Sequence, residues 1–416
     1  GWSPTASVDE SALALWDESF GPHYQAFEHK DCAFVLLNAQ IINSGLDAEL
    51  RQRAWLENRL AALDGKRLFV CLHYPPYLTQ EDEPEHYDNI AEPGRSWLLN
   101  LLARYDAEAM FSGHIHNFWF HRHRRTDCYQ LLSTAFVRQD YSEVLRTTPP
   151  ATSEAGRADL AKLGYAVVHV LDRRHFVEVV RTYGRQRAEG GDPPVKAAAP
   201  AMPRPLHSAE NWRAPLGFDL RHSWTEITQV PPSGALDEFD RKAARNDYPL
   251  MALWEMGVRK VRIPAGDIVD PQTRRRIAHL RDHGLSFRLF SQGLPERQLA
   301  EALETSGALL DEWEIAAPPD ELERLADVLQ AYRTGLDLPL YLSVLPSEAE
   351  QKAHRQSGST YYHLIRHGFG PAQGELLQRI ASRSLADGAI FRIPPTASPW
   401  EVMERETALC AELGLR

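Results

Sequence analysis

The sequence has little cysteine, no long apolar run and no excess of positive charge. Its four cysteines, Cys32, Cys71, Cys128 and Cys410, form no CxxC pair. Buried free thiols are therefore expected, and a reducing, cytoplasmic compartment is favoured. No apolar run reaches the length needed to cross a membrane. A formal net charge of −11 argues against nucleic acid or an anionic membrane as the main partner.

The remaining composition is that of an ordinary globular protein. Hydrophobic residues make up 43% of the chain and charged residues 25%, which are usual proportions for packed domains. A length of 416 residues is sufficient for two or three domains with cores of their own. Function therefore has to be sought in local patterns.

Strands alternate with helices in the first region, residues 1–183. Strands are expected at residues 33–39, 68–72 and 109–111, with helices at 48–63 and 96–105. After residue 116 the pattern becomes β, with strands at 117–123 and 128–133 and a hairpin across 165–182. Such alternation predicts a layered α/β sheet.

A linker separates this region from a second one. Residues 184–214 are rich in Pro, Ala and Gly and show no hydrophobic period. The second region, residues 215–416, repeats a strand–helix theme. Its expected strands cover residues 217–220, 258–263, 286–290, 312–316, 340–345 and 389–393. Five or six such units predict a (β/α) barrel-like domain, and the chain ends where another strand would be expected, so the barrel is expected to be incomplete.

Two histidine motifs follow strand ends in the first region. His73-Tyr74-Pro75-Pro76 follows one apolar run, and Gly113-His114-Ile115-His116 closes another. In layered α/β sheets ligands gather at strand ends, and imidazole is the commonest side-chain ligand of catalytic transition metals. Gly113 would allow the backbone to turn sharply before His114. Three ring nitrogens are thus expected to converge on one point.

These residues resemble the calcineurin-like metallophosphoesterases, over roughly residues 15–180. That family carries five motifs in order: DxH, GDxxD, GNH(D/E), a lone His at a strand end, and GHxH. The chain matches the last two. The segments 20–27 and 33–40, and a helix containing Gln52, Trp55 and Leu56, also resemble the family. The resemblance implies an α/β fold, an incomplete metallophosphoesterase β-sandwich with flanking helices.

The resemblance also implies a chemistry and a set of site residues. Family members use two divalent metal ions (Mn, Fe, Zn or similar) to activate water for attack on a small phosphomonoester or phosphodiester. By this likeness, His73 and His114 are ligands of one ion and His116 of the other. Tyr74 and Asn117 flank these ligands and are expected substrate contacts. No protein partner is indicated.

The first three motifs are absent, although they supply two aspartates, an asparagine and a further histidine in the family. Either the chain has lost its N-terminal half, or it is a segment of a longer precursor. Three histidines without carboxylates are expected to hold at most one ion, so this chain carries only the histidine half of the site. Hydrolysis by this chain alone is therefore not assured. The alternative is an inactive phosphoesterase-fold scaffold or binding module with a ligand-binding barrel.

Other patterns have two interpretations each. Residues 266–270 match GDxxD and could supply a bridging carboxylate in a rearranged chain, but a helix cap is favoured. His121 and His123 share one strand face and could contact metal or phosphate, but a solvated edge strand is favoured.

Residues 82–89 could form part of the rim of the substrate site, but a solvated acidic loop is favoured. A glycan-acting enzyme in the second region would require paired carboxylates at strand ends.

Overall fold

The computed structural model describes residues 8–63, 65–138, 140–141, 159–182, 216–220, 224–230, 241–356, 367–394 and 396–416. The chain divides into two compact units. The first consists of residues 1–208 and 224–257, and the second of residues 209–223 and 258–416. This division differs from the expected boundaries, because residues 224–257 group with the first unit. The expected linker, 184–214, lies outside the described residues.

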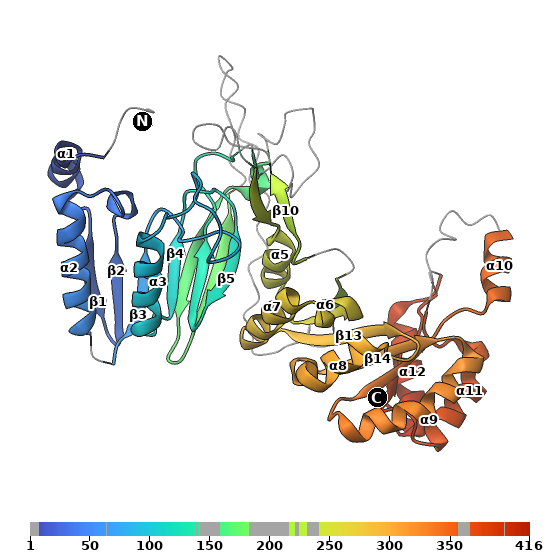
Figure 1. The fold of residues 1–416 in the computed structure, drawn as a ribbon. Helices are drawn as coiled ribbons and strands as arrows, with labels where there is room; N and C mark the ends of the chain where they lie inside the picture. Colours follow the sequence, from blue (N-terminus) through green and yellow to red (C-terminus); the bar gives the residue numbers. More distant parts are fainter. Residues whose placement is uncertain are drawn as a thin grey trace, which may run out of the picture. The chain divides into compact units, whose positions relative to one another are not determined.

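A six-stranded sheet forms the centre of the first unit (Figure 1). Its strands are β1 (Gln25–His29), β2 (Cys32–Leu36), β3 (Arg67–Cys71), β4 (Ala109–Ser112), β5 (Trp119–His123) and β6 (Thr126–Gln130). The order is β1-β2-β3-β4-β6-β5, in which β2, β3, β4 and β6 are parallel and the two edge strands are antiparallel to their neighbours. The ends of β3 and β4, which precede the histidine motifs, are therefore adjacent.

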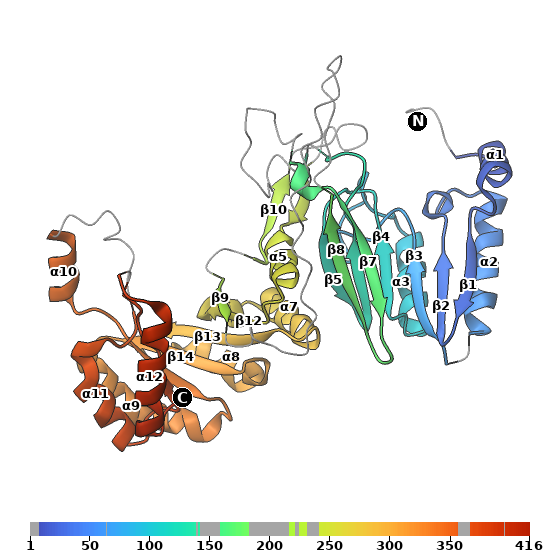
Figure 2. The ribbon, with the colours of Figure 1, turned by 180° about the vertical axis from the view of Figure 1, so that it is seen from behind.

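The two faces of this sheet have different cover. Helices α2 (Asp47–Ala61) and α3 (Gly94–Arg104) lie on one face, where they pack on aliphatic side chains such as Val70. The hairpin of β7 (Gly164–Val170) and β8 (His175–Arg181) lies on the other, as Figure 2 shows. There the rings of His175 and Phe69 are nearly perpendicular, with their centroids 5.8 Å apart. The α/β class is confirmed, and this hairpin takes the place expected for the second sheet.

The segment 224–257 covers the free edge of β5. It contains β10 (Ile227–Val230), β11 (Lys242–Arg245) and α5 (Tyr248–Met256). The backbone N–H of Phe120 donates to Asp247 Oδ2 at 2.8 Å, and Arg245 Nη2 donates to the Phe120 carbonyl at 3.0 Å. His121 and His123 are also buried, where His121 packs against the Tyr77 ring and His123 Nδ1 lies 2.7 Å from Glu81 Oε1. The predicted edge strand is confirmed, but its predicted solvation is wrong, because a segment more than a hundred residues away covers it.

The second unit contains a six-stranded parallel sheet. Its strands are β9 (Gly217–Asp219), β12 (Lys260–Pro264), β13 (Ser286–Gln292), β14 (Glu312–Ala317), β15 (Leu340–Val344) and β16 (Gly388–Ala389). They pair in chain order, β9-β12-β13-β14-β15-β16. This one-directional order is typical of a (β/α) barrel. Among the described residues the sheet is open at β9, so closure into a barrel stays a prediction.

Helices alternate with these strands. They are α6 (Ala265–Val269), α7 (Pro271–Asp282), α8 (Arg297–Ser306), α9 (Pro319–Gly335), α10 (Glu348–Gln356), α11 (Gly374–Ser382) and α12 (Pro399–Leu413). The GDxxD match falls on α6 and on the start of α7, where the Asp270 carboxylate accepts from the Thr273 N–H at 2.7 Å. The helix-cap interpretation of this motif is therefore confirmed for Asp270.

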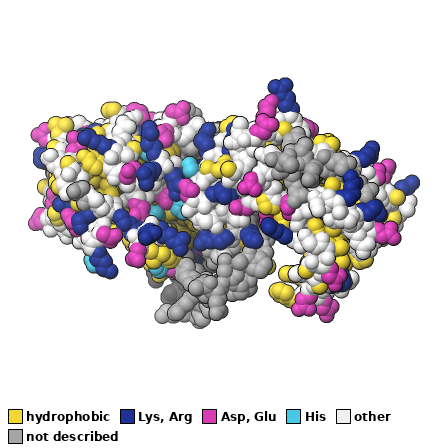
Figure 3. Space-filling model, turned by 90° about the horizontal axis from the view of Figure 1, so that it is seen from below, with side chains coloured by type: hydrophobic (Ala, Val, Ile, Leu, Met, Phe, Trp, Pro, Cys, Tyr) yellow, Lys and Arg dark blue, Asp and Glu magenta, His cyan; other side chains and the backbone are white. Residues whose placement is uncertain are grey.

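Two further sequence expectations can be compared with the described residues. All four cysteines are free, and Cys32, Cys128 and Cys410 are buried while Cys71 is partly exposed. Within the described ranges, no helix combines the length and apolarity that a membrane span requires. Figure 3 shows Lys and Arg side chains alongside Asp and Glu on one face of the molecule, with hydrophobic side chains between them.

Candidate histidine metal site

The histidine motifs lie at the same edge of the first sheet. His73 follows β3, and His114 and His116 follow β4, which is the parallel neighbour of β3. The Gly113 N–H donates to the His73 carbonyl at 3.0 Å and ties the two strand ends together. The topology therefore brings together the two motifs that the sequence suggested would meet.

The rings of His73 and His114 meet edge to face, with one ring nitrogen of each close to the other. His73 Nε2 and His114 Nδ1 are 3.2 Å apart, and the ring centroids are 5.0 Å apart. The other nitrogen of His114, Nε2, lies 3.1 Å from the Tyr87 carbonyl. A carbonyl can only accept, so His114 Nε2 carries the proton and its Nδ1 presents a lone pair to His73. With metal–nitrogen bonds of about 2.0–2.1 Å, two ligands of a tetrahedral ion lie roughly 3.3–3.4 Å apart, so the same spacing suits a shared ion.

Both histidines of the GHxH motif have left-handed backbone conformations. The φ angle is 68° at His114 and 51° at His116. Residues other than glycine are uncommon there, and such positions store about 1–3 kcal/mol each. Gly113, which the sequence suggested as the turning residue, does not have a positive φ. The sharp turn is made by the histidines themselves, which aims their side chains at the strand-end loops.

The site favours neutral imidazoles. Partial burial, together with the neighbouring His114 and His116, lowers the pKa of His73 to about 4. Burial and the nearby Arg138 guanidinium also lower the pKa of His116. Nδ1 of His116 is buried and has no hydrogen-bond partner within the described part of the chain. Neutral imidazole with an available lone pair is the form that binds metal ions.

These residues fit part of one metal site and do not fit a dinuclear centre. Among the described residues, no group of three or more His, Cys, Asp or Glu side chains is placed to hold an ion. The Asp88 carboxylate is near, but its Oδ1 lies 3.3 Å from Nε2 of His114, on the side of the ring away from His73. It is thus placed to orient a ligand rather than to act as one.

The two expected substrate contacts have different settings. The Tyr74 ring packs against His114 with centroids 4.2 Å apart and is half-buried. Asn117 is fully buried, and its amide nitrogen and oxygen have no hydrogen-bond partner in the described ranges. Contact with substrate stays a prediction for both residues.

The acidic loop 82–89 is not uniformly solvated, as the sequence suggested. Glu83 is buried and accepts from the N–H groups of Leu78 and Thr79, at 2.7 and 2.8 Å. Asp88 is fully buried and contacts Lys242 of β11. The solvated interpretation is wrong for these two carboxylates, because buried N–H groups and cations bind them. No local pattern could have indicated the Lys242 contact, since the two residues are 154 positions apart.

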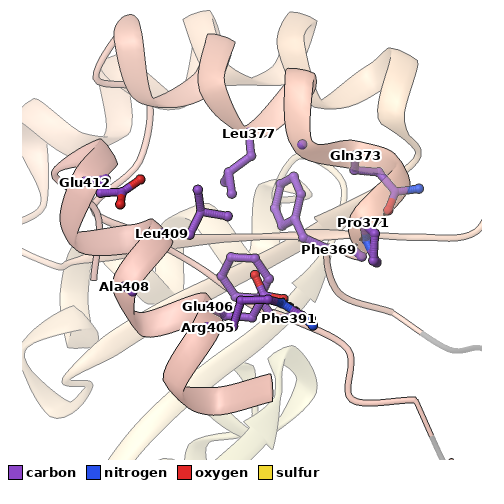
Figure 4. A pocket seen from close by; sticks show the side chains of 12 residues that line it. Phe369, Pro371, Gln373, Leu377, Phe391, Arg405, Glu406, Ala408, Leu409 and Glu412 are labelled. Atoms are coloured by element: carbon purple, nitrogen blue, oxygen red, sulfur yellow. Dashed lines mark hydrogen bonds and ion pairs between the residues drawn. The ribbon is translucent and has the colours of Figure 1, made fainter. Parts of the chain in front are cut away.

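The second unit also contains cavities. One of about 400 Å³ lies between α11 and α12, and Figure 4 shows Leu377, Leu409, Phe369 and Phe391 around it. Its lining is largely apolar and carries no catalytic constellation.

A second cavity, of about 280 Å³, opens on the polar face of the parallel sheet near Arg288 and Glu312. Across the described part of this face the glutamates are bound by arginines. Arg262 binds Glu314, at 2.7 and 3.0 Å, and Arg288 binds Glu312. The free pair of carboxylates that a glycan-acting enzyme requires is therefore not seen among the described residues.

Comparison with known proteins gives a partial match. No family model matches the chain. Over 122 residues the chain is 30% identical to serine/threonine-protein phosphatase CPPED1 of Mus musculus and 30% identical to that of Danio rerio. Each match covers 28% of this chain and 38% of the relative, so the chain spans about two fifths of the length of these relatives.

Solved structures give weaker matches. GAP50, the anchor in the inner membrane complex of Plasmodium, matches with a TM-score of 0.27 and 13% identity, over 38% of this chain and 49% of that chain. A putative 5'-nucleotidase from Staphylococcus aureus matches with a TM-score of 0.20 and 12% identity, over 38% and 28%. These TM-scores are too low to establish a shared fold. The sequence similarity to a phosphatase agrees with the two histidine motifs, and part of this chain is thus similar to the calcineurin-like metallophosphoesterases.

Proposed function

We propose that the first unit contributes the histidine side of a metal-dependent phosphoester hydrolase site. The observation that carries this proposal is the facing pair of His73 Nε2 and His114 Nδ1 at adjacent parallel strand ends. The orientation of His114 supports it, because the Tyr87 carbonyl holds the proton on the opposite nitrogen. His116 is the proposed ligand of the other ion, because no group of three or more ligands is placed around a single ion among the described residues.

The proposed substrates are small phosphomonoesters or phosphodiesters. A divalent ion such as Mn, Fe or Zn, when bound, would lower the pKa of water and polarise the phosphoryl oxygens. The chain's own residues would hold neutral imidazoles in place, and Tyr74 would contact the substrate. The carboxylate ligands of a dinuclear centre would have to come from outside the described residues, since no three-ligand group is present among them.

The test combines metal analysis with turnover of bis-p-nitrophenyl phosphate by the full-length protein. Wild type is expected to bind a divalent metal and to hydrolyse the ester, and His114→Ala is expected to lose both. His29→Ala is the matched control, because His29 is an exposed histidine on the edge strand β1. A folded wild-type protein that binds no divalent metal and cleaves no phosphoester would refute the proposal.

The second candidate is a phosphoesterase-fold scaffold without catalysis, with the proposed barrel of the second unit binding a ligand. The absence of a three-ligand group among the described residues favours it. A double variant, His73→Ala/His114→Ala, distinguishes the two candidates. If the scaffold candidate is correct, this variant keeps the unfolding temperature and every binding property of the wild type. A DxH, GDxxD, GNH(D/E) series in the reading frame upstream would favour the hydrolase instead.

A further inference from the structure

A buried cluster of charged groups lies behind His114. We name it the Asp88 cluster, and it consists of Asp88, Arg138, Asp140, Tyr141 and Lys242. Asp88 is fully buried and accepts from the Tyr141 hydroxyl at 2.6 Å and from Arg138 and Lys242. Asp140 shares the same two cations, with Arg138 Nη2 at 2.6 Å and Lys242 Nζ at 2.9 Å. Two carboxylates and two cations balance each other in this interior.

The cluster keeps Asp88 ionised. Burial alone would raise the pKa of this carboxyl, but the hydrogen bond from His114 and the charges of Arg138 and Lys242 outweigh it and hold the pKa well below its ordinary range. An ionised, immobilised carboxylate is a stronger acceptor than a neutral group. The residues that fix it come from two distant places in the sequence, with Arg138 and Tyr141 in one and Lys242 in the other.

Asp88 differs from Asp140 in two contacts, the hydrogen bond from the Tyr141 hydroxyl and the approach to His114. Its Oδ1 lies 3.3 Å from Nε2 of His114, within ion-pair distance, while the Nε2–H group donates its hydrogen bond to the Tyr87 carbonyl at 3.1 Å. No such contact exists for Asp140 among the described residues. The two aspartates thus belong to one charge cluster, but only one of them touches the histidine that faces His73.

We propose that Asp88 is a positioning residue that keeps His114 in the Nε2–H tautomer with its Nδ1 lone pair turned toward His73. The inference rests on the proposed function in taking these two histidines as metal ligands. Outer acceptors of this kind fix the tautomer and orientation of a ligating imidazole and raise its basicity. Without Asp88, the Tyr87 carbonyl alone would restrain the ring, and the Nδ1–H tautomer could donate to His73 instead.

The experiment compares Asp88→Asn with Asp140→Asn in the full chain. Both variants remove one negative charge from the Asp88 cluster, and an Asn at position 88 can still accept from the Tyr141 hydroxyl, so a merely structural role would not separate their His114 tautomers. The first readout is the tautomer of His114 in metal-free protein, from ¹⁵N shifts of the imidazole. The second is Zn²⁺ affinity by competition titration with a chelator. Asp88→Asn is expected to raise the Nδ1–H population and to weaken Zn²⁺ binding about 10- to 100-fold, whereas Asp140→Asn changes affinity by less than about 3-fold.

A second pair of variants controls for misfolding caused by an unbalanced buried charge. Asp88→Asn/Lys242→Met and Asp140→Asn/Lys242→Met each leave one carboxylate opposite Arg138, so both are balanced in charge. Only the first is expected to shift the His114 tautomer.

The outcomes separate this inference from the proposed function. Equal effects of the two aspartate substitutions, or an unchanged tautomer in both Asp88 variants, would overturn the role of Asp88. A wild-type protein that binds no Zn²⁺ and cleaves no phosphoester would refute the proposed function, while the tautomer comparison would still decide the role of Asp88.

Discussion

At the residue scale, the strand-end histidines were predictable and the groups that hold them were not. His73 and His114 each follow an apolar run, and parallel neighbours end at the same edge of a sheet, so their meeting follows from local pattern. Asp88 lies in a loop that reads as solvent-exposed, and its partner Lys242 lies on a short strand far along the chain. Long-range charge pairing leaves no periodic signal in one sequence.

Glu83 gives a prediction about acid stability. Burial alone would raise its pKa, but hydrogen bonds from His86, Asn89 and the backbone outweigh burial and lower the pKa to about 2. The folded-state value is below the ordinary 4.5, so the carboxylate stabilises the fold above that pH, and this contribution is lost as the pH falls through about 2. Glu83→Gln is expected to lose on the order of 3 kcal/mol of unfolding free energy at pH 7 and to show a smaller decline on acidification.

Urea unfolding at pH 7 and at pH 3 measures both effects. The control is Glu85→Gln, because Glu85 is exposed in the same loop. A Glu83→Gln protein with wild-type stability at both pH values would contradict the prediction.

At the element scale, prediction succeeded where a strand has a strong apolar or alternating pattern. β3, β13, β14 and β15 read as continuous apolar or alternating runs and lie within a few residues of their expected bounds. β11 was missed because its sequence, Lys-Ala-Ala-Arg, has no β pattern and pairs only with β10. α1 (Glu10–Phe20) was missed because its apolar side chains Trp16 and Phe20 are exposed, so no buried stripe marks a helix.

The start of α7 is testable at this scale. Asp270 accepts from the Thr273 N–H, and loss of such a cap costs about 1 kcal/mol. Asp270→Ala is therefore expected to speed hydrogen exchange of the first-turn amides of α7 roughly fivefold, whereas Asp270→Ser, which keeps a capping oxygen, stays close to wild type. Equal exchange in the two variants would show that the cap contributes nothing.

At the scale of the whole molecule, the chain length predicts more than one domain, but nothing in the sequence indicates that the first compact unit is discontinuous. Its sheet comes from residues before 131, and the cover of β5 comes from residues 241–256. The charged side chains Arg245 and Asp247 make this attachment, and charged residues usually signal surface. Only the fold shows that they are buried and paired.

The Arg245–Asp247 pair predicts how strongly the first unit depends on this segment. Arg245 Nε is 2.8 Å from Asp247 Oδ1, and both side chains are buried. Removing one partner leaves an uncompensated buried charge, so Arg245→Met is expected to destabilise the first unit by roughly 3–5 kcal/mol in urea unfolding. Arg259→Met, in the second unit, is the control. If Arg245→Met lost no more unfolding free energy than Arg259→Met, the attachment of this segment would be shown to contribute nothing to the stability of the first unit.

The discontinuity has a consequence for how the chain is connected. Since residues 209–223 belong to the second unit and residues 224–257 return to the first, the backbone passes between the units three times. A protease that nicks any single crossing would leave fragments still associated, held by the β9–β12 ladder or by the seam at β5. A nicked protein would then run as two fragments on a denaturing gel but elute as one species from a size-exclusion column. A single cut therefore releases neither unit from the other.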